Sequence, residues 1–129
     1  MIQVICPVCG AALAPQGAAW RCTQGHCFDV ARQGYVNLLT VTQKHSRHPG
    51  DTREMVAARR AFLDAGWYAP IAKTLADLVR RFCPEAASVL DAGCGEGYYL
   101  SQLGWVPERW GIDISRDAVR YAAVRDRSA

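Results

Sequence analysis

The sequence predicts a mixed α/β chain: a small metal-stapled module in front, a helical segment in the middle, and one βαβ unit of a parallel sheet at the end. Three observations predict it. Cysteines and a histidine cluster near the start, apolar residues recur at helical spacing in the middle, and a glycine-rich turn separates two strand-like runs. A length of 129 residues is normal for one domain and small for two, so the front module is expected to be tiny.

Composition is that of a globular chain, because half of the residues are hydrophobic and 21% are charged. No apolar run approaches the roughly 20 residues that cross a membrane. The start, MIQVICPVCG, lacks the basic segment and long apolar core of a secretory signal. We therefore expect a cytoplasmic protein with no membrane partner.

Charge divides the chain into two parts. Residues 1–50 hold four Lys/Arg against one acid, Asp29, whereas residues 51–129 hold eleven of each sign. The first part also contains all three histidines and four of the six cysteines. This division predicts a zinc-binding module over residues 1–40, a basic linker over 41–50, and a separate unit over 51–129.

The zinc prediction depends on the spacing of Cys6, Cys9, Cys22 and His26. A C-x2-C turn lets two thiolates converge on one ion, and a second loop supplies the other two ligands of a closed, structural tetrahedral site. Disulfides are the alternative, but a reducing cytosol disfavours them. Because His26 and Cys27 are adjacent, spacing alone does not choose the fourth ligand.

The stretch TVTQKHSRHPGD follows this module and has no helical or strand periodicity. Lys44, Arg47 and His48 make it cationic. It is either a solvated linker or a segment that contacts phosphates, since clustered basic residues are typical of nucleic-acid binding.

Two helices are expected next. Asp51 and Glu54 form a capping-box-like start, and the first helix runs to Gly66. Pro70 suits the first turn of a second helix, which ends at Cys83. Its apolar face is Ile71, Leu75, Leu78, Val79 and Phe82.

The stretch SVLDAGCGEGYYL then predicts a short buried strand over residues 88–91, a glycine turn, and a helix beginning near Gly97. Glycines let the backbone bend sharply and approach a ligand without a Cβ in the way. The strand-like run RWGIDIS puts Asp113 at the end of the next strand, where an acid can accept both hydroxyls of a ribose. Cys83 and Cys94 are expected to be small buried hydrophobes.

The pattern D-x-G-x-G-x-G resembles motif I of class I S-adenosylmethionine-dependent methyltransferases, which have a Rossmann-like fold. This resemblance implies that the loop binds the methionine part and the adenosine of the cofactor. The residues that it places beside the cofactor are Asp91, Gly93, Gly95, Glu96, Gly97 and Asp113.

A closer resemblance is to the bacterial 23S rRNA (guanine-N1)-methyltransferases, which join a zinc-binding domain to a class I methyltransferase domain. The matching stretches are CPVC, C..GH.FD.A..GYVNLL, PGD...M..ARR.FLDAG.Y.P and VLDAGCGEGYY. The resemblance implies that His26 is the fourth zinc ligand and that Tyr68 approaches the cofactor. It also implies 23S rRNA as partner, with the zinc module and basic linker gripping a hairpin, and leaves room for a homodimer.

The implied reaction is direct transfer of a methyl group to guanine N1 of an unpaired or flipped base, and the sequence names no catalytic base. The family continues for about as many residues again, so the cofactor domain is expected to be incomplete and this chain alone inactive. The short connection from Tyr99 to Gly111 predicts a trimmed helix, and the ending VRDRSA departs from the family. The alternatives are a non-catalytic zinc-dependent RNA-binding fragment and a truncated, inactive gene product.

Overall fold

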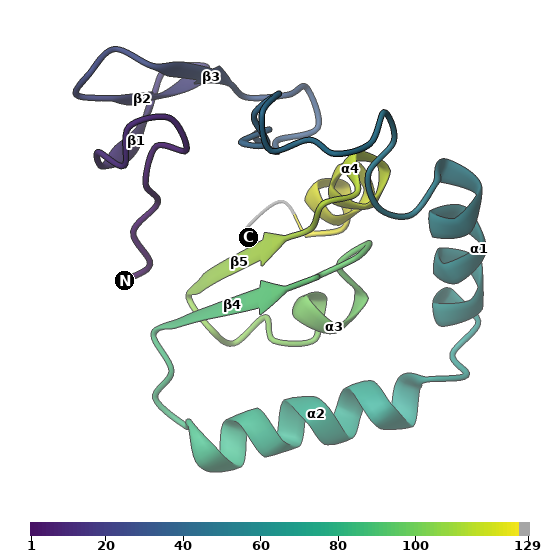
Figure 1. The fold of residues 1–129 in the computed structure, drawn as a ribbon. Helices are drawn as coiled ribbons and strands as arrows, with labels where there is room; N and C mark the ends of the chain where they lie inside the picture. The colour runs from purple at the N-terminus through teal and green to yellow at the C-terminus, as the bar shows by residue number, and fades with distance from the viewer. Residues whose placement is uncertain (127–129) are drawn as a thin grey trace.

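The computed structural model describes residues 1–126 (Figure 1), so the last three residues of the VRDRSA ending lie outside the described part. Within residues 1–126 the structure has two sheets and four helices, and α3 connects the two strands of the second sheet. Their bounds are β1 Leu13–Gln16, β2 Ala19–Cys22, β3 Cys27–Asp29, α1 Arg53–Asp64, α2 Ala69–Phe82, β4 Ser88–Ala92, α3 Tyr98–Ser101, β5 Glu108–Ile112 and α4 Arg116–Arg125. None of the described helices is long and apolar enough to cross a membrane.

The front module is a three-stranded antiparallel sheet in the order β1-β2-β3. Its core is small and sulfur-rich, with Cys6, Leu13 and Cys22 buried together. Trp20, Phe28 and Leu38 are among the partly buried side chains that pack against this core. So few apolar groups make a metal staple physically reasonable.

Helix α1 begins one residue later than the predicted cap. Thr52, not Asp51, is the N-cap, and its side chain accepts a hydrogen bond from the Met55 backbone N–H. The Asp51 carboxylate instead pairs with Arg59 at 2.6 Å. Both residues are good caps, and the pairing with Arg59 gives Asp51 a different role.

Helix α2 has the expected bounds, with a proline in its first turn and Cys83 as C-cap. Its predicted apolar face, however, is uncovered in the described structure. Ile71, Leu75, Leu78 and Phe82 are all exposed, and Ala72 is the buried residue of the helix. Amphipathic spacing therefore predicted the helix correctly but did not say what covers it.

The second sheet pairs β4 and β5 in parallel, with Leu90 opposite Trp110 and Ala92 opposite Ile112. A Cβ on Gly111 would lie 2.9 Å from Cys94 Sγ, so one face of the sheet packs tightly against the glycine turn. On the other face Leu90 and Ile112 are about half exposed. The connecting helix α3 is only four residues long, as the short connection predicts.

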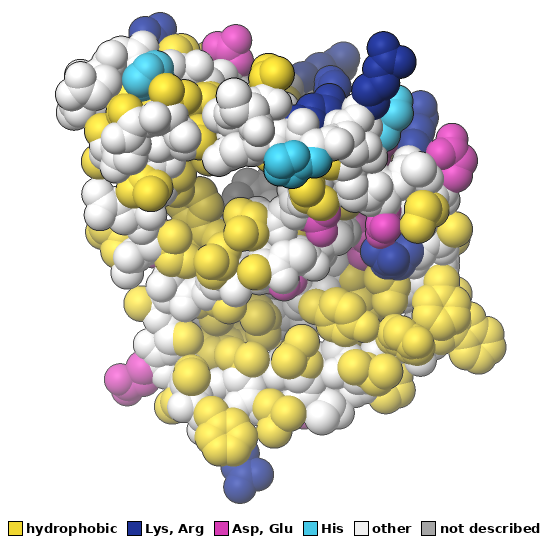
Figure 2. Space-filling model, viewed as in Figure 1, with side chains coloured by type: hydrophobic (Ala, Val, Ile, Leu, Met, Phe, Trp, Pro, Cys, Tyr) yellow, Lys and Arg dark blue, Asp and Glu magenta, His cyan; other side chains and the backbone are white. Residues whose placement is uncertain are grey.

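Contacts at β5 join the front module to this sheet. The rings of Trp20 and Trp110 meet edge to face, with centroids 5.7 Å apart. Glu108 Oε1 accepts hydrogen bonds from the Ile2 backbone N–H and from Trp110 Nε1. In Figure 2, Lys, Arg and His side chains gather along the upper part of the molecule, whereas the lower part of this face, around the sheet and α2, is largely hydrophobic.

Candidate functional site

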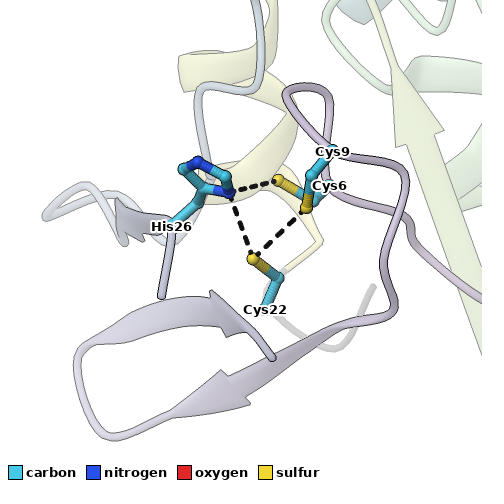
Figure 3. Close-up of side chains that lie close together, drawn as sticks. All are labelled: Cys6, Cys9, Cys22 and His26. Carbon is cyan, nitrogen blue, oxygen red and sulfur yellow. Dashed lines mark hydrogen bonds between the residues drawn. The ribbon is translucent and has the colours of Figure 1, made fainter. Parts of the chain in front are cut away.

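The front module brings four potential metal ligands together. Cys6, Cys9, Cys22 and His26 offer ligand atoms that all lie within 4.8 Å of one another. Cys6 Sγ is 3.6 Å and Cys22 Sγ 3.4 Å from His26 Nδ1, and Cys9 Sγ is 3.7 Å from Cys22 Sγ (Figure 3). Cys6 and Cys9 lie in the turn before β1, Cys22 is the last residue of β2, and His26 lies in the turn between β2 and β3.

These separations fit zinc. Zn–S bonds of about 2.3 Å and Zn–N bonds of about 2.0 Å in tetrahedral geometry place ligand sulfurs about 3.8 Å apart and sulfur about 3.5 Å from nitrogen. Burial opposes ionisation of the Cys22 thiol, but hydrogen bonds from the backbone of His26 and Gln24 outweigh it and lower the pKa of Cys22 to about 6. A thiolate, the form that binds metal, is therefore favoured at neutral pH.

The remaining cysteines lie outside this cluster. Cys27 is next to His26 in β3, is exposed and does not join the four ligands. Cys94 is buried, and burial together with Asp91 and Asp113 raises the pKa of its thiol to about 12, which fits the expected inert hydrophobe. The same expectation was wrong for Cys83, which caps the exposed end of α2 and is itself exposed.

The glycine turn after β4 needs its glycines for two different reasons. Gly93, Gly95 and Gly97 all have positive φ, at 84°, 57° and 85°. A Cβ on Gly93 or Gly95 would meet nothing within 4 Å, whereas a Cβ on Gly97 would lie 3.1 Å from Ala122 of α4. The first two glycines thus border open space, and the third permits close packing against α4.

That open space is part of a pocket of about 500 Å³. The glycine turn forms one side, and α1 with the residues after it forms the other. Tyr68 joins this wall, with its ring 4.9 Å from that of Phe62. The lining residues are Arg59, Phe62, Leu63, Tyr68, Gly93, Cys94, Gly95, Glu96, Tyr98 and Tyr99.

Asp113 follows β5 directly and is tied to the glycine turn. Its Oδ2 accepts a hydrogen bond of 3.0 Å from the Gly95 backbone N–H, and its Oδ1 accepts one of 2.8 Å from the Ser115 N–H. Burial, with a smaller contribution from Asp113, raises the pKa of Asp91. The charge of Asp113 therefore disfavours ionisation of Asp91 at the ends of β4 and β5. Neither acid lines the pocket beside the glycine turn.

Glu96 is buried and faces basic and backbone partners. Its carboxylate accepts a hydrogen bond from the Tyr98 backbone N–H at 3.1 Å and from Arg125 Nε at 2.9 Å. Arg125 also contacts Asp64 at the end of α1. The structure thus places Glu96 beside the pocket and pairs it with α4.

Lys44, Arg47 and His48 are exposed and line a second, larger cavity of about 1380 Å³. Its opposite wall includes β5 and basic residues of α4, among them Arg116 and Arg120. Acidic side chains such as Asp117 also border it. The predicted RNA-contacting residues therefore share this cavity with Asp113, whose carboxylate accepts the hydrogen bond from Gly95 of the glycine turn.

Two residues that sequence reasoning missed, Ser115 and Arg125, contact the β5–α4 turn and the glycine turn. Ser115 is 1% exposed and caps α4, and its position two residues after Asp113 and two before Asp117 was a usable capping signal. Arg125 meets Glu96 across 29 residues of sequence, a separation for which the sequence carries no local signal.

Comparison with known proteins finds a match for the front module and relatives for most of the chain. Residues 4–47 match the zinc-ribbon family model described as RlmA, N-terminal. Three curated relatives match 92% of this chain. They are the "Putative 23S rRNA (guanine-N(1)-)-methyltransferase" of Micromonospora griseorubida, at 43% identity, the "23S rRNA (guanine(748)-N(1))-methyltransferase" of Streptomyces fradiae, at 45%, and the "Putative 23S rRNA (guanine-N(1)-)-methyltransferase YxjB" of Bacillus subtilis (strain 168), at 35%.

The chain spans less than half the length of these relatives, namely 46%, 43% and 44%. Within that span, the matched zinc ribbon coincides with the Cys6, Cys9, Cys22 and His26 cluster. By sequence, the chain is therefore similar to part of proteins named 23S rRNA (guanine-N(1)-)-methyltransferases, and its front module matches the RlmA N-terminal zinc-ribbon model.

Proposed function

We propose that this chain supplies the zinc module and the front half of the cofactor site of an enzyme that uses S-adenosylmethionine to methylate guanine N1 in a hairpin loop of 23S rRNA. The carrying observation is the pocket beside Gly93 and Gly95, whose missing Cβ atoms leave open space next to Tyr68. The names of the relatives support the rRNA substrate.

In this proposal the fold of residues 51–126 is the start of a Rossmann-like domain. Gly93 and Gly95 let backbone approach the methionine part and adenosine, and Tyr68 closes the opposite wall. Asp113 accepts the ribose hydroxyls, Glu96 holds the turn through the Tyr98 backbone N–H, and Asp91 lies beside the cofactor at the end of β4. When bound, the cofactor supplies an electrophilic methyl group that guanine N1 attacks.

The front half of the chain has a separate role. Residues 1–40 bind structural zinc, and the basic linker 41–50 presents Lys44, Arg47 and His48 to the phosphates of the hairpin. A cytoplasmic location fits an enzyme of ribosomal RNA.

Methyl transfer from labelled S-adenosylmethionine to an unmodified 23S rRNA hairpin, by an enzyme that contains this chain together with a complete cofactor site, tests the proposal. Methylation at N1 blocks the Watson–Crick edge, so primer extension on the product locates it. Gly95→Ala should reduce binding of S-adenosylhomocysteine by about tenfold or more, because it fills open space and strains a left-handed residue. Equal binding by Gly95→Ala and the parent chain would contradict the cofactor assignment.

A second candidate is zinc-dependent RNA binding without catalysis. The cavity that Lys44, Arg47 and His48 line favours it, because basic side chains of α4, Arg116 and Arg120, line the same cavity. It requires hairpin binding that is lost on chelation of zinc, together with no binding of S-adenosylhomocysteine by the parent chain.

A further inference from the structure

The segment Pro49–Gly50–Asp51, here called the strap, lies against the turn between β5 and α4. Ser115 Oγ donates a 2.7 Å hydrogen bond to the Asp51 backbone carbonyl, across 64 residues of sequence. A Cβ on Gly50 would lie 2.8 Å from the Ser115 backbone nitrogen and 2.9 Å from Ile114 Cγ2. With φ at +79°, Gly50 is required both for its backbone conformation and for this close approach.

The turn that the strap touches also fixes Asp113. Ser115 donates its backbone N–H to Asp113 Oδ1, while Gly95 donates to Asp113 Oδ2. Ser115 is almost completely buried, and its hydroxyl also accepts from the Ala118 N–H at the start of α4. Hydrogen bonds therefore run without a gap from the strap through Ser115 and Asp113 to the glycine turn.

The other end of the strap is anchored in α1. The Asp51 carboxylate pairs with Arg59, a residue of α1 that lines the pocket. Thr52 then caps α1. The strap is thus held on one side by the pocket wall and on the other by the turn that carries Asp113.

We propose that the strap positions Asp113, so that Gly50 and the Asp51 carbonyl act on the cofactor site through Ser115. This inference rests on the proposed function for its consequence, the holding of a ribose. The positioning itself concerns this chain's own hydrogen bonds. Gly50 and Ser115 are positioning residues, and only Asp113 would touch the cofactor.

The test compares Gly50→Ala with Gly17→Ala. Gly17 lies in the turn between β1 and β2 with φ at +63°, and its Cβ would meet nothing within 4 Å. Both variants carry left-handed strain, but only Gly50→Ala pushes on Ser115. Far-UV circular dichroism and thermal unfolding check that each variant is folded.

The first readout is hydrogen exchange of the Gly95 and Ser115 amides in the cofactor-free chain. We expect faster exchange at both amides in Gly50→Ala and parent rates in Gly17→Ala. Parent rates at both amides in folded Gly50→Ala would overturn the inference. If Gly50→Ala does not fold, Ser115→Ala takes its place, and parent exchange at Gly95 in that variant overturns the inference equally.

The second readout is ligand affinity. Gly50→Ala should weaken the binding of S-adenosylhomocysteine by about tenfold. This is the loss expected when a charged hydrogen-bonding partner is displaced. Adenosine should lose more affinity than 2′,3′-dideoxyadenosine, which has no hydroxyls for Asp113 to accept. Equal losses for the two nucleosides would overturn the positioning of Asp113. If the Gly95 amide exchanges faster in Gly50→Ala but even the parent chain does not bind S-adenosylhomocysteine, the positioning of Asp113 by the strap is supported and the proposed cofactor is contradicted.

Discussion

At the scale of single residues, the sequence is most informative about the metal ligands of the front module. The ligand spacing predicted a metal cluster because each thiolate or imidazole is chemically distinctive, and the four side chains do meet. The choice between His26 and Cys27 could not be made from spacing. In the structure His26, in the turn before β3, joins the cluster, whereas Cys27, the first residue of β3, is exposed.

Replacing Cys6 by Ser should remove bound zinc and unfold the front module, because a tetrahedral site loses a buried thiolate ligand. Cys27→Ser is the matched control, since Cys27 is exposed and outside the cluster. Metal analysis of both purified variants checks this. Loss of zinc from Cys27→Ser with retention in Cys6→Ser would contradict the ligand set.

Secondary-structure elements were predicted well where apolar spacing was strong and poorly where it was not. Helix α2 follows its spacing from Pro70 to Cys83. The strands β1 and β2, in contrast, read LAPQ and AWRC and show little alternation. The cysteine core, not an alternating apolar face, holds these strands together, so their sequences show no strand-like alternation.

The glycine turn and the strand after it show the same limit. Their existence follows from local sequence, but their mutual ties do not. Asp113 meets Gly95, and Arg109 of β5 forms a two-point ion pair with Asp126 at the end of α4, at 2.9 and 3.0 Å. Such long-range partners depend on the packing of whole elements, which a local pattern does not encode.

Asp126→Asn should lower the free energy of unfolding by on the order of 3 kcal/mol, because it removes the carboxylate charge that forms a two-point pair with the buried Arg109 guanidinium. Asp117→Asn is the control on the same helix. Its contact with Arg120 is exposed and 3.7 Å long, so a change within about 0.5 kcal/mol is expected. Urea unfolding of both variants measures the difference, and equal effects would show that the Arg109 pair contributes nothing special.

At the scale of the whole molecule, apolar surface is uncovered on α2 and on one face of the second sheet (Figure 2). The sequence predicted an amphipathic helix and a buried strand, but it did not say what covers them. Within the described residues that face stays open, at Leu75 and Leu78 of α2 and at Leu90 of β4. Large exposed apolar patches mark interaction surfaces or aggregation liabilities.

We therefore expect this chain to self-associate. Leu75→Glu should reduce association while changing stability by no more than about 0.5 kcal/mol, because the side chain is already exposed. Ala72→Glu, on the buried side of the same helix, should instead unfold the protein. Sedimentation velocity at increasing protein concentration measures the association. A parent chain that stays monomeric throughout would contradict the expectation.

The edge-to-face pair of Trp20 and Trp110 gives this molecule an optical property. One indole belongs to the zinc-ribbon sheet and the other to β5, and their planes cross at 79°. Aromatic chromophores held this closely in a fixed, asymmetric arrangement couple electronically, and the coupling falls steeply with separation. Far-ultraviolet circular dichroism, in the region of the strong indole transition, should therefore carry an excitonic signal from this pair, and its loss would report separation of the two halves of the chain.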